Sequence, residues 1–308
     1  MRFSALSVAF ALAPRLPLRW VLSAARAGAR RAARRGGANV DQLRSNLRRL
    51  TGGEPDQELV VRAVESHIRN YAEQLVLGSP KGAPLLERVV FEDFDRIEEA
   101  SEDGPVVLAL GHSGSWDRAG AWVCAHGRPV VTVAERVEPP SLFDSFVRLR
   151  EGLGMEIIGV GKGESVFDTL VERVRGRSVL VPLLADRDIS GAGIEVDFAG
   201  HRALVAAGPA ALAHRLSRPL YAACVSYADE DAPVASVRVE FAGPITAAPG
   251  GGANEVEALT QAWVDAFTGM LADKPEDWHM MQKVYTEDLD PERLARARAA
   301  HRSRGAGQ

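Results

Sequence analysis

The sequence predicts an α/β fold with a mixed central sheet flanked by helices, preceded by amphipathic helices at a membrane interface. Three observations predict it. From residue 105 onward, short apolar runs rich in β-branched residues alternate with helical stretches, which is typical of strands in a largely parallel or mixed sheet. Helical periodicity precedes these runs, and the first 50 residues are strongly basic. With 46% hydrophobic and 25% charged residues, the 308-residue chain can build a substantial core.

The N-terminal 50 residues form a basic segment. They contain eleven arginines and one acidic residue, Asp41, which gives a net charge of +10, so the rest of the chain carries −14. Basic side chains near acidic lipid headgroups each contribute about 1 kcal/mol to binding, so an anionic membrane surface is the expected partner. Nucleic acid is the weaker alternative, because aliphatic residues rather than stacking aromatics separate the arginines. We therefore expect no nucleic-acid partner.

The apolar stretch at residues 3–13 does not predict a transmembrane helix. A span takes about 20 residues, and Pro14 and Arg15 interrupt this stretch far earlier. We expect residues 3–35 to form helices that lie in the membrane interface, with the apolar face in lipid and the arginines at the headgroups. A signal peptide and ordinary helices packed on the body of the protein are the alternatives.

The remaining elements follow in order along the chain. Helices are predicted at residues 43–50 and 58–77, the second with Val61, Val64 and Ile68 on one face. Strands are predicted at residues 106–110, 130–133, 155–158, 179–183, 220–227 and 236–241, followed by a loop at 247–253 and a helix at 255–271. The expected organisation is a membrane-associating segment at 1–50, one domain at 51–290, and a basic, disordered tail at 291–308. Cys124 and Cys224 lack metal-ligand spacing and are expected to be buried thiols, so no metal site is predicted.

The stretch with the clearest chemical meaning is Leu110-Gly-His-Ser-Gly-Ser-Trp-Asp117, which follows the first of these strands. His112 therefore lies at the carboxyl end of a strand, where open α/β sheets bind their ligands. If a tight turn at Gly114 folds the chain back, the Asp117 carboxylate accepts the imidazole N–H and stabilises the imidazolium formed when the other nitrogen takes a proton. Such a pair is a general base for a hydroxyl nucleophile. The plain alternative is a His and an Asp that cap a helix.

The same residues nearly match a different catalytic motif. Gly-x-Ser-x-Gly places a nucleophilic serine on a sharp turn in α/β-hydrolases, and only the last glycine is missing here. In that interpretation Ser113 is the nucleophile and His279 is the downstream histidine.

A second polar cluster, Asp186-Arg-Asp188, follows the strand at 179–183. Carboxylates on both sides of Arg187 would orient its guanidinium to clamp a phosphate or phosphodiester. Asp-x-Asp after a strand also fits a metal-bound sugar nucleotide, as in a glycosyltransferase, and a surface ion-pair network is the plain alternative.

These segments together resemble a known family. His112-Ser-Gly-Ser-Trp-Asp117 resembles the His-x-x-x-x-Asp/Glu box of the lysophospholipid acyltransferase superfamily, in the His-x-Gly-Asn-Trp-Glu form of the late lipid A acyltransferases, with Asp for Glu and Ser115 for Asn. The segments that agree in order are Ala134-Glu-Arg136, Asp186-Arg-Asp188, Glu195 to Gly200 and Lys274-Pro-Glu-Asp-Trp-His279. The resemblance covers roughly residues 1–290 and is most like the phosphatidylinositol mannoside acyltransferases of mycobacteria.

The resemblance implies a membrane-associated O-acyltransferase on the cytoplasmic face of the plasma membrane. It would move a long-chain acyl group, palmitoyl, from acyl-CoA to a mannose hydroxyl of phosphatidylinositol mannoside or a related glycolipid, with no cofactor and no acyl-enzyme. His112 would deprotonate the hydroxyl, Asp117 would orient His112, and Glu195 and His279 would line the sugar pocket. The residues expected to bind substrate are Glu135, Arg136, Arg187, Asp188, Glu195 and His279. A hydrolase that uses Ser113 and a non-catalytic lipid-binding protein of the same fold are the alternatives.

Overall fold

The computed structural model describes residues 12–305 except 162–163, 190, 230–231, 233 and 248–254. The strands are β1 (Val89–Phe91), β2 (Val106–Leu110), β3 (Val130–Glu135), β4 (Met155–Val160), β5 (Leu180–Leu184), β6 (Ile194–Phe198), β7 (His201–Val205), β8 (Leu220–Ala228) and β9 (Ser236–Ala242). The α-helices are α2 (Leu18–Arg35), α3 (Ala38–Thr51), α4 (Gln57–Leu77), α5 (Ala83–Leu86), α6 (Phe94–Glu102), α7 (Trp116–Ala125), α8 (Pro140–Gly152), α9 (Phe167–Val174), α10 (Gly208–Leu216), α11 (Glu255–Leu271) and α12 (Pro291–Gly305).

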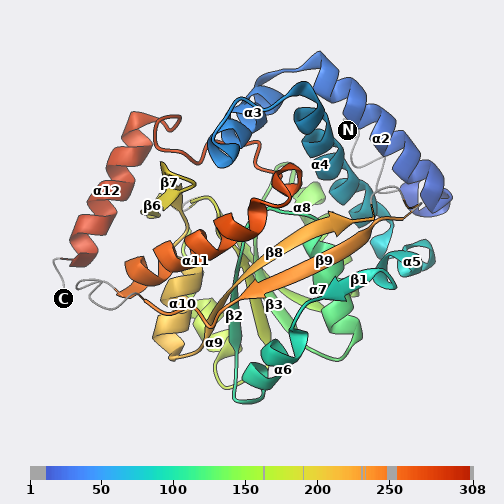
Figure 1. Ribbon diagram of the computed structural model, residues 1–308. Helices are drawn as coiled ribbons and strands as arrows, with labels where there is room; N and C mark the ends of the chain where they lie inside the picture. The colour runs from blue at the N-terminus through green and yellow to red at the C-terminus, as the bar shows by residue number, and fades with distance from the viewer. Residues whose placement is uncertain are drawn as a thin grey trace.

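A seven-stranded sheet with the order β1-β9-β8-β2-β5-β3-β4 lies at the centre of the molecule, with helices on both faces (Figure 1). β8, β2, β5, β3 and β4 run parallel to one another, whereas β9 pairs antiparallel with β8. β6 and β7 form a separate antiparallel hairpin. The predicted α/β class with a mixed central sheet is therefore confirmed.

The strands are buried on both faces, which explains why their sequences are continuous apolar runs and do not alternate between apolar and polar residues. In β2, Val107 and Ala109 belong to the core on the side of α10 and α11, while Leu108 and Leu110 belong to the core under α4 and α7. All the strands predicted from these runs are present. The three-residue strand β1 and the hairpin of β6 and β7 were not predicted, because short runs such as Val89–Phe91 carry little periodic signal.

The N-terminal helices form a layer of their own. α2 packs on α4, and Ala29, Leu43 and Val64 are buried in the cluster that α2, α3 and α4 share. None of the helices in the described part of the chain combines the length and the hydropathy that a membrane span requires. Residues 1–11 of the expected interface helices lie outside the described residues, and the expected position of residues 3–35 at a membrane interface stays a prediction.

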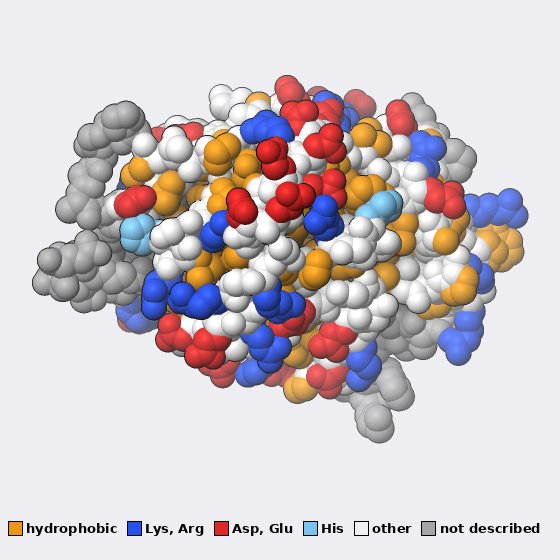
Figure 2. All heavy atoms as spheres, turned by 90° about the horizontal axis from the view of Figure 1, so that it is seen from below, with side chains coloured by type: hydrophobic (Ala, Val, Ile, Leu, Met, Phe, Trp, Pro, Cys, Tyr) orange, Lys and Arg blue, Asp and Glu red, His pale blue; other side chains and the backbone are white. Residues whose placement is uncertain are grey.

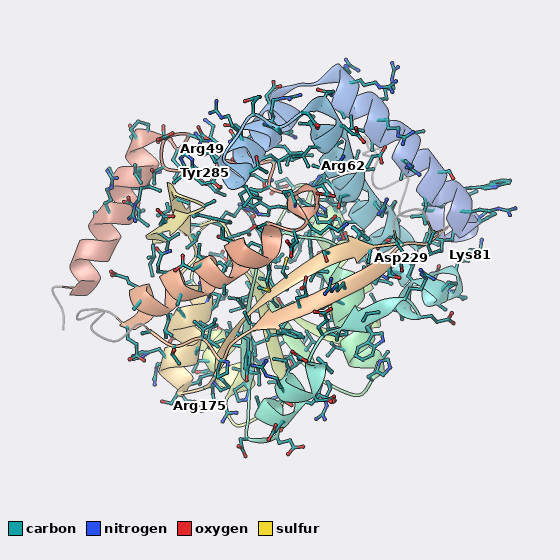
Figure 3. The ribbon with its side chains drawn as sticks, viewed as in Figure 1. Arg49, Arg62, Lys81, Arg175, Asp229 and Tyr285 are labelled. Carbon is teal, nitrogen blue, oxygen red and sulfur yellow. The ribbon has the colours of Figure 1, made fainter. Side chains whose placement is uncertain are left out.

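The segment that follows α11 is held against α3. Arg49 of α3 lies with its guanidinium 4.9 Å from the ring centroid of Tyr285, and its Nη1 is 2.7 Å from Oδ2 of Asp288 (Figure 3). Nearby, the amide of Asn46 donates to the carbonyl of Met280 at 2.8 Å. The position of this segment matters because it carries Trp278 and His279 into the interior.

The C-terminal tail differs from the expectation. Residues 291–305 form α12 instead of a disordered tail. The helix is held by apolar and ionic contacts, since Ala297 is buried against Leu204 and Leu289, and Arg298 pairs with Glu195 of β6. Because the segment is rich in arginine, its composition did not indicate that one face of this helix is buried.

Candidate active site

The carboxyl ends of the parallel strands border one large cleft with a volume of about 1650 Å³. His112 follows β2, Glu135 and Arg136 lie at the end of β3, and Arg187 follows β5. All four side chains line the cleft. Its position agrees with the rule that open α/β sheets bind ligands at the carboxyl ends of their strands.

His112 is held by a buried carboxylate from the neighbouring strand. Its Nδ1 lies 2.6 Å from Oδ1 of Asp186, and its backbone N–H donates to Oδ2 of the same residue at 2.8 Å. The indole N–H of Trp278 also donates to that Oδ2, at 2.8 Å. Three hydrogen bonds therefore fix the Asp186 carboxylate, which is fully buried.

The electrostatics of this pair determine which nitrogen of His112 can act as a base. Burial by itself would raise the pKa of the Asp186 carboxyl, but His112 and the hydrogen bonds from His112 and Trp278 lower that pKa below its usual value. The carboxylate is therefore ionised and can only accept, so the proton of a neutral His112 ring lies on Nδ1. Nε2 is left with a free lone pair on a side chain that lines the cleft and is 23% exposed. This is the arrangement of a general base.

The hydrogen bond expected between His112 and Asp117 is not formed. Gly114 does make the predicted tight turn, with a φ of +54°. However, Asp117 lies in the first turn of α7 and faces α8, where Nε of Arg150 is 2.5 Å from its Oδ1 and Nη2 is 3.0 Å from its Oδ2. The predicted contact is therefore wrong, and Asp186 takes the place of Asp117 beside His112. Asp117 instead holds Arg150, which lines the cleft.

The basic residues predicted at the cleft are paired with acids there. Nη2 of Arg187 lies 2.6 Å from Oε2 of Glu135, and Nη1 of Arg136 lies 3.1 Å from Oε2 of Glu164. All four residues line the cleft, and the carboxylate beside the Arg187 guanidinium is that of Glu135. Asp186, one of the two acids expected to orient Arg187, instead binds His112 and Trp278. Their role in substrate binding stays a prediction.

Two residues predicted to bind substrate lie elsewhere. Asp188 is buried in its own loop, where its Oδ2 accepts the backbone N–H of Gly191 at 2.9 Å. Oε1 of Glu195 accepts a hydrogen bond from Nε of Arg298 at 2.6 Å. Neither residue is among those that line the cleft, although Ile194 is. The expectation that Glu195 lines the sugar pocket is wrong. Its carboxylate is bound to Arg298 of α12, a helix that was not predicted.

Two further histidines lie beside His112 in the cleft. His279 was predicted to bind substrate, and its backbone N–H donates to the carbonyl of His112 at 2.7 Å. His67 of α4 was not predicted, and the centroid of its ring lies 5.4 Å from that of His279. Arg150 and His67 lie within ordinary helices, so no motif in the sequence marked them.

Ser113 is not placed to act as a nucleophile. Its side chain is fully buried, and its Oγ accepts the backbone N–H of Val225 at 3.2 Å. A nucleophile elbow instead presents its serine at an exposed position. The structure also does not support the glycosyltransferase interpretation, which needs the Asp186 carboxylate to bind a metal. That carboxylate is hydrogen-bonded to His112 and Trp278.

A narrow apolar cavity of about 90 Å³ lies next to the cleft. It extends between α7 and the sheet, among side chains such as Phe91, Leu108 and Phe241. Trp116 and Arg150 line both the cleft and this cavity, so the two spaces meet at these residues.

Comparisons with known proteins agree with this geometry. The sequence is 37% identical over 275 residues to the phosphatidylinositol mannoside acyltransferase of Mycolicibacterium smegmatis. The matched region covers 88% of this chain and 86% of the relative. It is 35% identical over 285 residues to the protein of the same name from Mycobacterium tuberculosis, covering 88% of this chain and 84% of the relative. Residues 3–287 match the model of the bacterial lipid A biosynthesis acyltransferases. The chain therefore belongs to the bacterial lipid A biosynthesis acyltransferase family and is an O-acyltransferase.

Proposed function

We propose that this acyltransferase moves a long-chain acyl group, palmitoyl, from acyl-CoA to a mannose hydroxyl of a phosphatidylinositol mannoside. The observation that carries the proposal is the pairing of His112 with Asp186, which leaves Nε2 of His112 as a base at the floor of a large cleft. The names of the two mycobacterial relatives support the choice of acceptor.

The reaction then needs no covalent enzyme intermediate. Nε2 of His112 takes the proton of the sugar hydroxyl, and the oxygen attacks the carbonyl carbon of the thioester. Asp186 stabilises the imidazolium while the tetrahedral intermediate exists. When the intermediate collapses, the C–S bond breaks and the thiolate takes the proton back from His112. The products are the sugar ester and free CoA.

The apolar cavity beside the cleft offers a hydrophobic surface to part of an acyl chain. Its lining at Phe91, Leu108 and Phe241 is hydrophobic, and it meets the cleft at Trp116, whose ring centroid lies 5.7 Å from that of His112. An acyl chain entering there would have its thioester near His112. Each buried CH₂ of such a chain contributes about 0.8 kcal/mol.

We place the enzyme as a peripheral protein on the cytoplasmic face of the plasma membrane, where acyl-CoA is available. Leu12, Leu16 and Trp20, the last 59% exposed, present apolar side chains at the start of the described chain. Arg15 and Arg19 lie between them in sequence. Hydrophobic side chains beside Lys and Arg side chains are visible at the right edge of Figure 2, the side on which Figure 1 places the beginning of α2. Apolar groups flanked by arginines suit an anionic lipid surface.

The test is product analysis by mass spectrometry after incubation with palmitoyl-CoA and phosphatidylinositol mannoside. We expect the mannoside to gain one palmitoyl group, and His112→Ala to abolish transfer, since loss of a positioned general base costs about 10²–10⁴-fold in rate. Acylation of only a different lipid acceptor would refute the proposed substrate. Trapping of an acyl group on the protein would refute the proposed mechanism.

A further inference from the structure

Trp278 contacts the pair of His112 and Asp186 but does not line the cleft. Its side chain is fully buried, and its indole N–H donates to Oδ2 of Asp186 at 2.8 Å. The residues that line the cleft include His112 but not Trp278. Any influence of Trp278 on the reaction therefore passes through Asp186.

The backbone fixes the indole relative to His112. Trp278 forms an antiparallel bridge with Ser113, and the backbone N–H of the residue after Trp278 donates to the carbonyl of His112 at 2.7 Å. The indole also packs against other aromatic rings, with its centroid 5.1 Å from that of Phe198 and 6.5 Å from that of Tyr285. The N–H donor and the base thus belong to one tightly connected local structure.

The two oxygens of the Asp186 carboxylate have different partners. Oδ2 accepts the backbone N–H of His112 and the indole N–H of Trp278, both at 2.8 Å, while Oδ1 lies 2.6 Å from Nδ1 of His112. A Cβ at Gly111 would lie only 3.1 Å from Oδ2, so the glycine leaves room for the carboxylate. With the backbone N–H as its only other donor, the carboxylate would be free to turn about its last torsion, which is broad for aspartate.

We infer that Trp278 is a positioning residue for acyl transfer: its indole N–H holds Oδ2 of Asp186, so that Oδ1 stays aligned with Nδ1 of His112. The inference rests on the proposed mechanism, in which Nε2 of His112 takes the proton of the acceptor hydroxyl. Trp278 touches neither substrate, so it acts on the rate of the chemical step and not on binding.

The same N–H affects how readily the pair takes up a proton. Burial raises the pKa of the Asp186 carboxyl, whereas His112 and the hydrogen bond from Trp278 lower it. The N–H is the positive end of a bond dipole, so it disfavours a further proton on the pair, which titrates as a unit. Removal of the N–H should therefore let the ring of His112 take up a proton at a higher pH.

The other histidines of the cleft do not obscure this effect. Burial lowers the pKa of His67 to about 4 and that of His279 well below its usual value. Glu135 and Arg187, which line the same cleft, pair with each other. A ring in the cleft that gains its proton between about pH 5 and 8 is therefore that of His112.

Two tryptophan substitutions separate the hydrogen bond from packing. Trp278→Phe keeps an aromatic ring and removes the N–H. Trp263→Phe, in α11, is the matched control, because Trp263 is equally buried and its Nε1 has no hydrogen-bond partner among the described residues. Both changes remove the same volume from the core, so both should lower Tm.

Only Trp278→Phe should change catalysis. We expect its kcat for transfer from palmitoyl-CoA to phosphatidylinositol mannoside to fall about ten- to hundredfold, as for the loss of a hydrogen bond to a charged group. KM for both substrates should stay near the wild-type values, because Trp278 does not line the cleft. The Trp263→Phe variant should retain the wild-type kcat.

The pH dependence supplies a readout that packing alone would not change. NMR titration of the histidine rings, with the His112 signals identified by their loss in His112→Ala, gives the pH at which the ring is half protonated. We expect this midpoint to rise by about one pH unit in Trp278→Phe and to stay unchanged in Trp263→Phe. The acidic limb of the profile of kcat/KM against pH should move in the same direction.

Equal kcat values and equal His112 midpoints in the two variants would overturn the inference, because Trp278 would then only fill space. Absence of transfer to any mannoside by the wild-type protein would instead overturn the proposed function. The NMR titration needs no substrate, so it would still decide whether Trp278 controls the pair of His112 and Asp186.

Discussion

His112 and Asp186 occupy matching positions beyond the ends of two adjacent parallel strands. Leu110 of β2 pairs in register with Leu184 of β5, and each member of the pair follows its leucine by two residues. Strands in a sheet lie about 4.8 Å apart, so residues at the same level of neighbouring strands bring their side chains together. The distance of 2.6 Å between Nδ1 and Oδ1 is thus a result of the sheet register.

We predict that Asp186→Asn lowers kcat for acyl transfer by at least a hundredfold. An amide cannot stabilise the imidazolium, and it can offer a donor to Nδ1 and so favour the wrong tautomer. A comparable substitution in the Ser-His-Asp triad lowers kcat about 10⁴-fold. Asp188→Asn is the matched control, because this acid lies two residues away and outside the cleft lining. Equal activity of the two variants in steady-state kinetics would disprove the role of Asp186.

Ser113→Ala should leave most of the transfer activity. The hydroxyl is buried and accepts a hydrogen bond from the backbone N–H of Val225, so its removal should lower the free energy of unfolding by about 1 kcal/mol. Chemical denaturation and a transfer assay on the same preparation measure both effects. A variant that folds normally but has lost transfer would restore Ser113 as a candidate nucleophile.

Glu195→Gln should not change kcat/KM for the sugar acceptor. Its carboxylate is bound to Arg298, with a second arginine, Arg202, at 3.8 Å, and it does not line the cleft. The variant should show little change in Tm, because pairs of this kind near the surface contribute little. Weaker transfer to the sugar, with unchanged palmitoyl-CoA binding, would mean that Glu195 reaches the acceptor after all.

Stability should depend on pH through His67. Burial, with a smaller contribution from His112, lowers the pKa of His67 from 6.5 to about 4. Between these values the unfolded chain binds a proton that the folded protein does not, so stability falls as the pH drops from 6.5 toward 4, by up to about 1.4 kcal/mol per pH unit from this group. Urea titrations of the wild-type protein and His67→Phe across this range isolate the contribution. Identical pH dependence in both proteins would contradict it.

Membrane binding should depend on the exposed apolar residues near α2 and on salt. Trp20→Ser should weaken binding to liposomes that contain acidic lipid, because Trp20 is 59% exposed and lies next to Arg19. Binding of the wild-type protein should rise with the acidic lipid content and fall with salt, since charges are screened within about 10 Å at 0.1 M. Val90→Ser, on β1, removes a comparably exposed side chain and is the control. Equal binding to neutral liposomes in high salt would exclude electrostatic docking.

The sequence identified one member of the proposed catalytic pair, His112, but not the other, Asp186. His112 was identifiable because a glycine-rich turn follows a clear apolar strand. Asp117 was chosen as its partner because it is near in sequence, whereas the actual partner lies 74 residues away. Linear patterns predicted both strands but not that β5 lies beside β2, and only that adjacency brings Asp186 to His112.

The sequence also could not show which side chains contact elements that it did not predict. Glu195 was expected in the sugar pocket because the segment from Glu195 to Gly200 resembles the corresponding segment of the family. Its true partner, Arg298, belongs to a helix that composition suggested was disordered. Arg150 of α8 pairs with Asp117 of α7, and the ring of His67 lies beside that of His279, so their place in the cleft follows from tertiary packing alone.

The register of β2 and β5 also determines where the chain tolerates changes in length. One residue inserted between Leu184 and Asp186 would shift the carboxylate by about 3.3 Å along the strand direction, out of hydrogen-bonding reach of His112. An insertion in the connection before β2, at the opposite edge of the sheet, would leave the same pair untouched. Among natural variants of this enzyme, loop lengths should therefore vary freely at the amino ends of these two strands and hardly at all at their carboxyl ends.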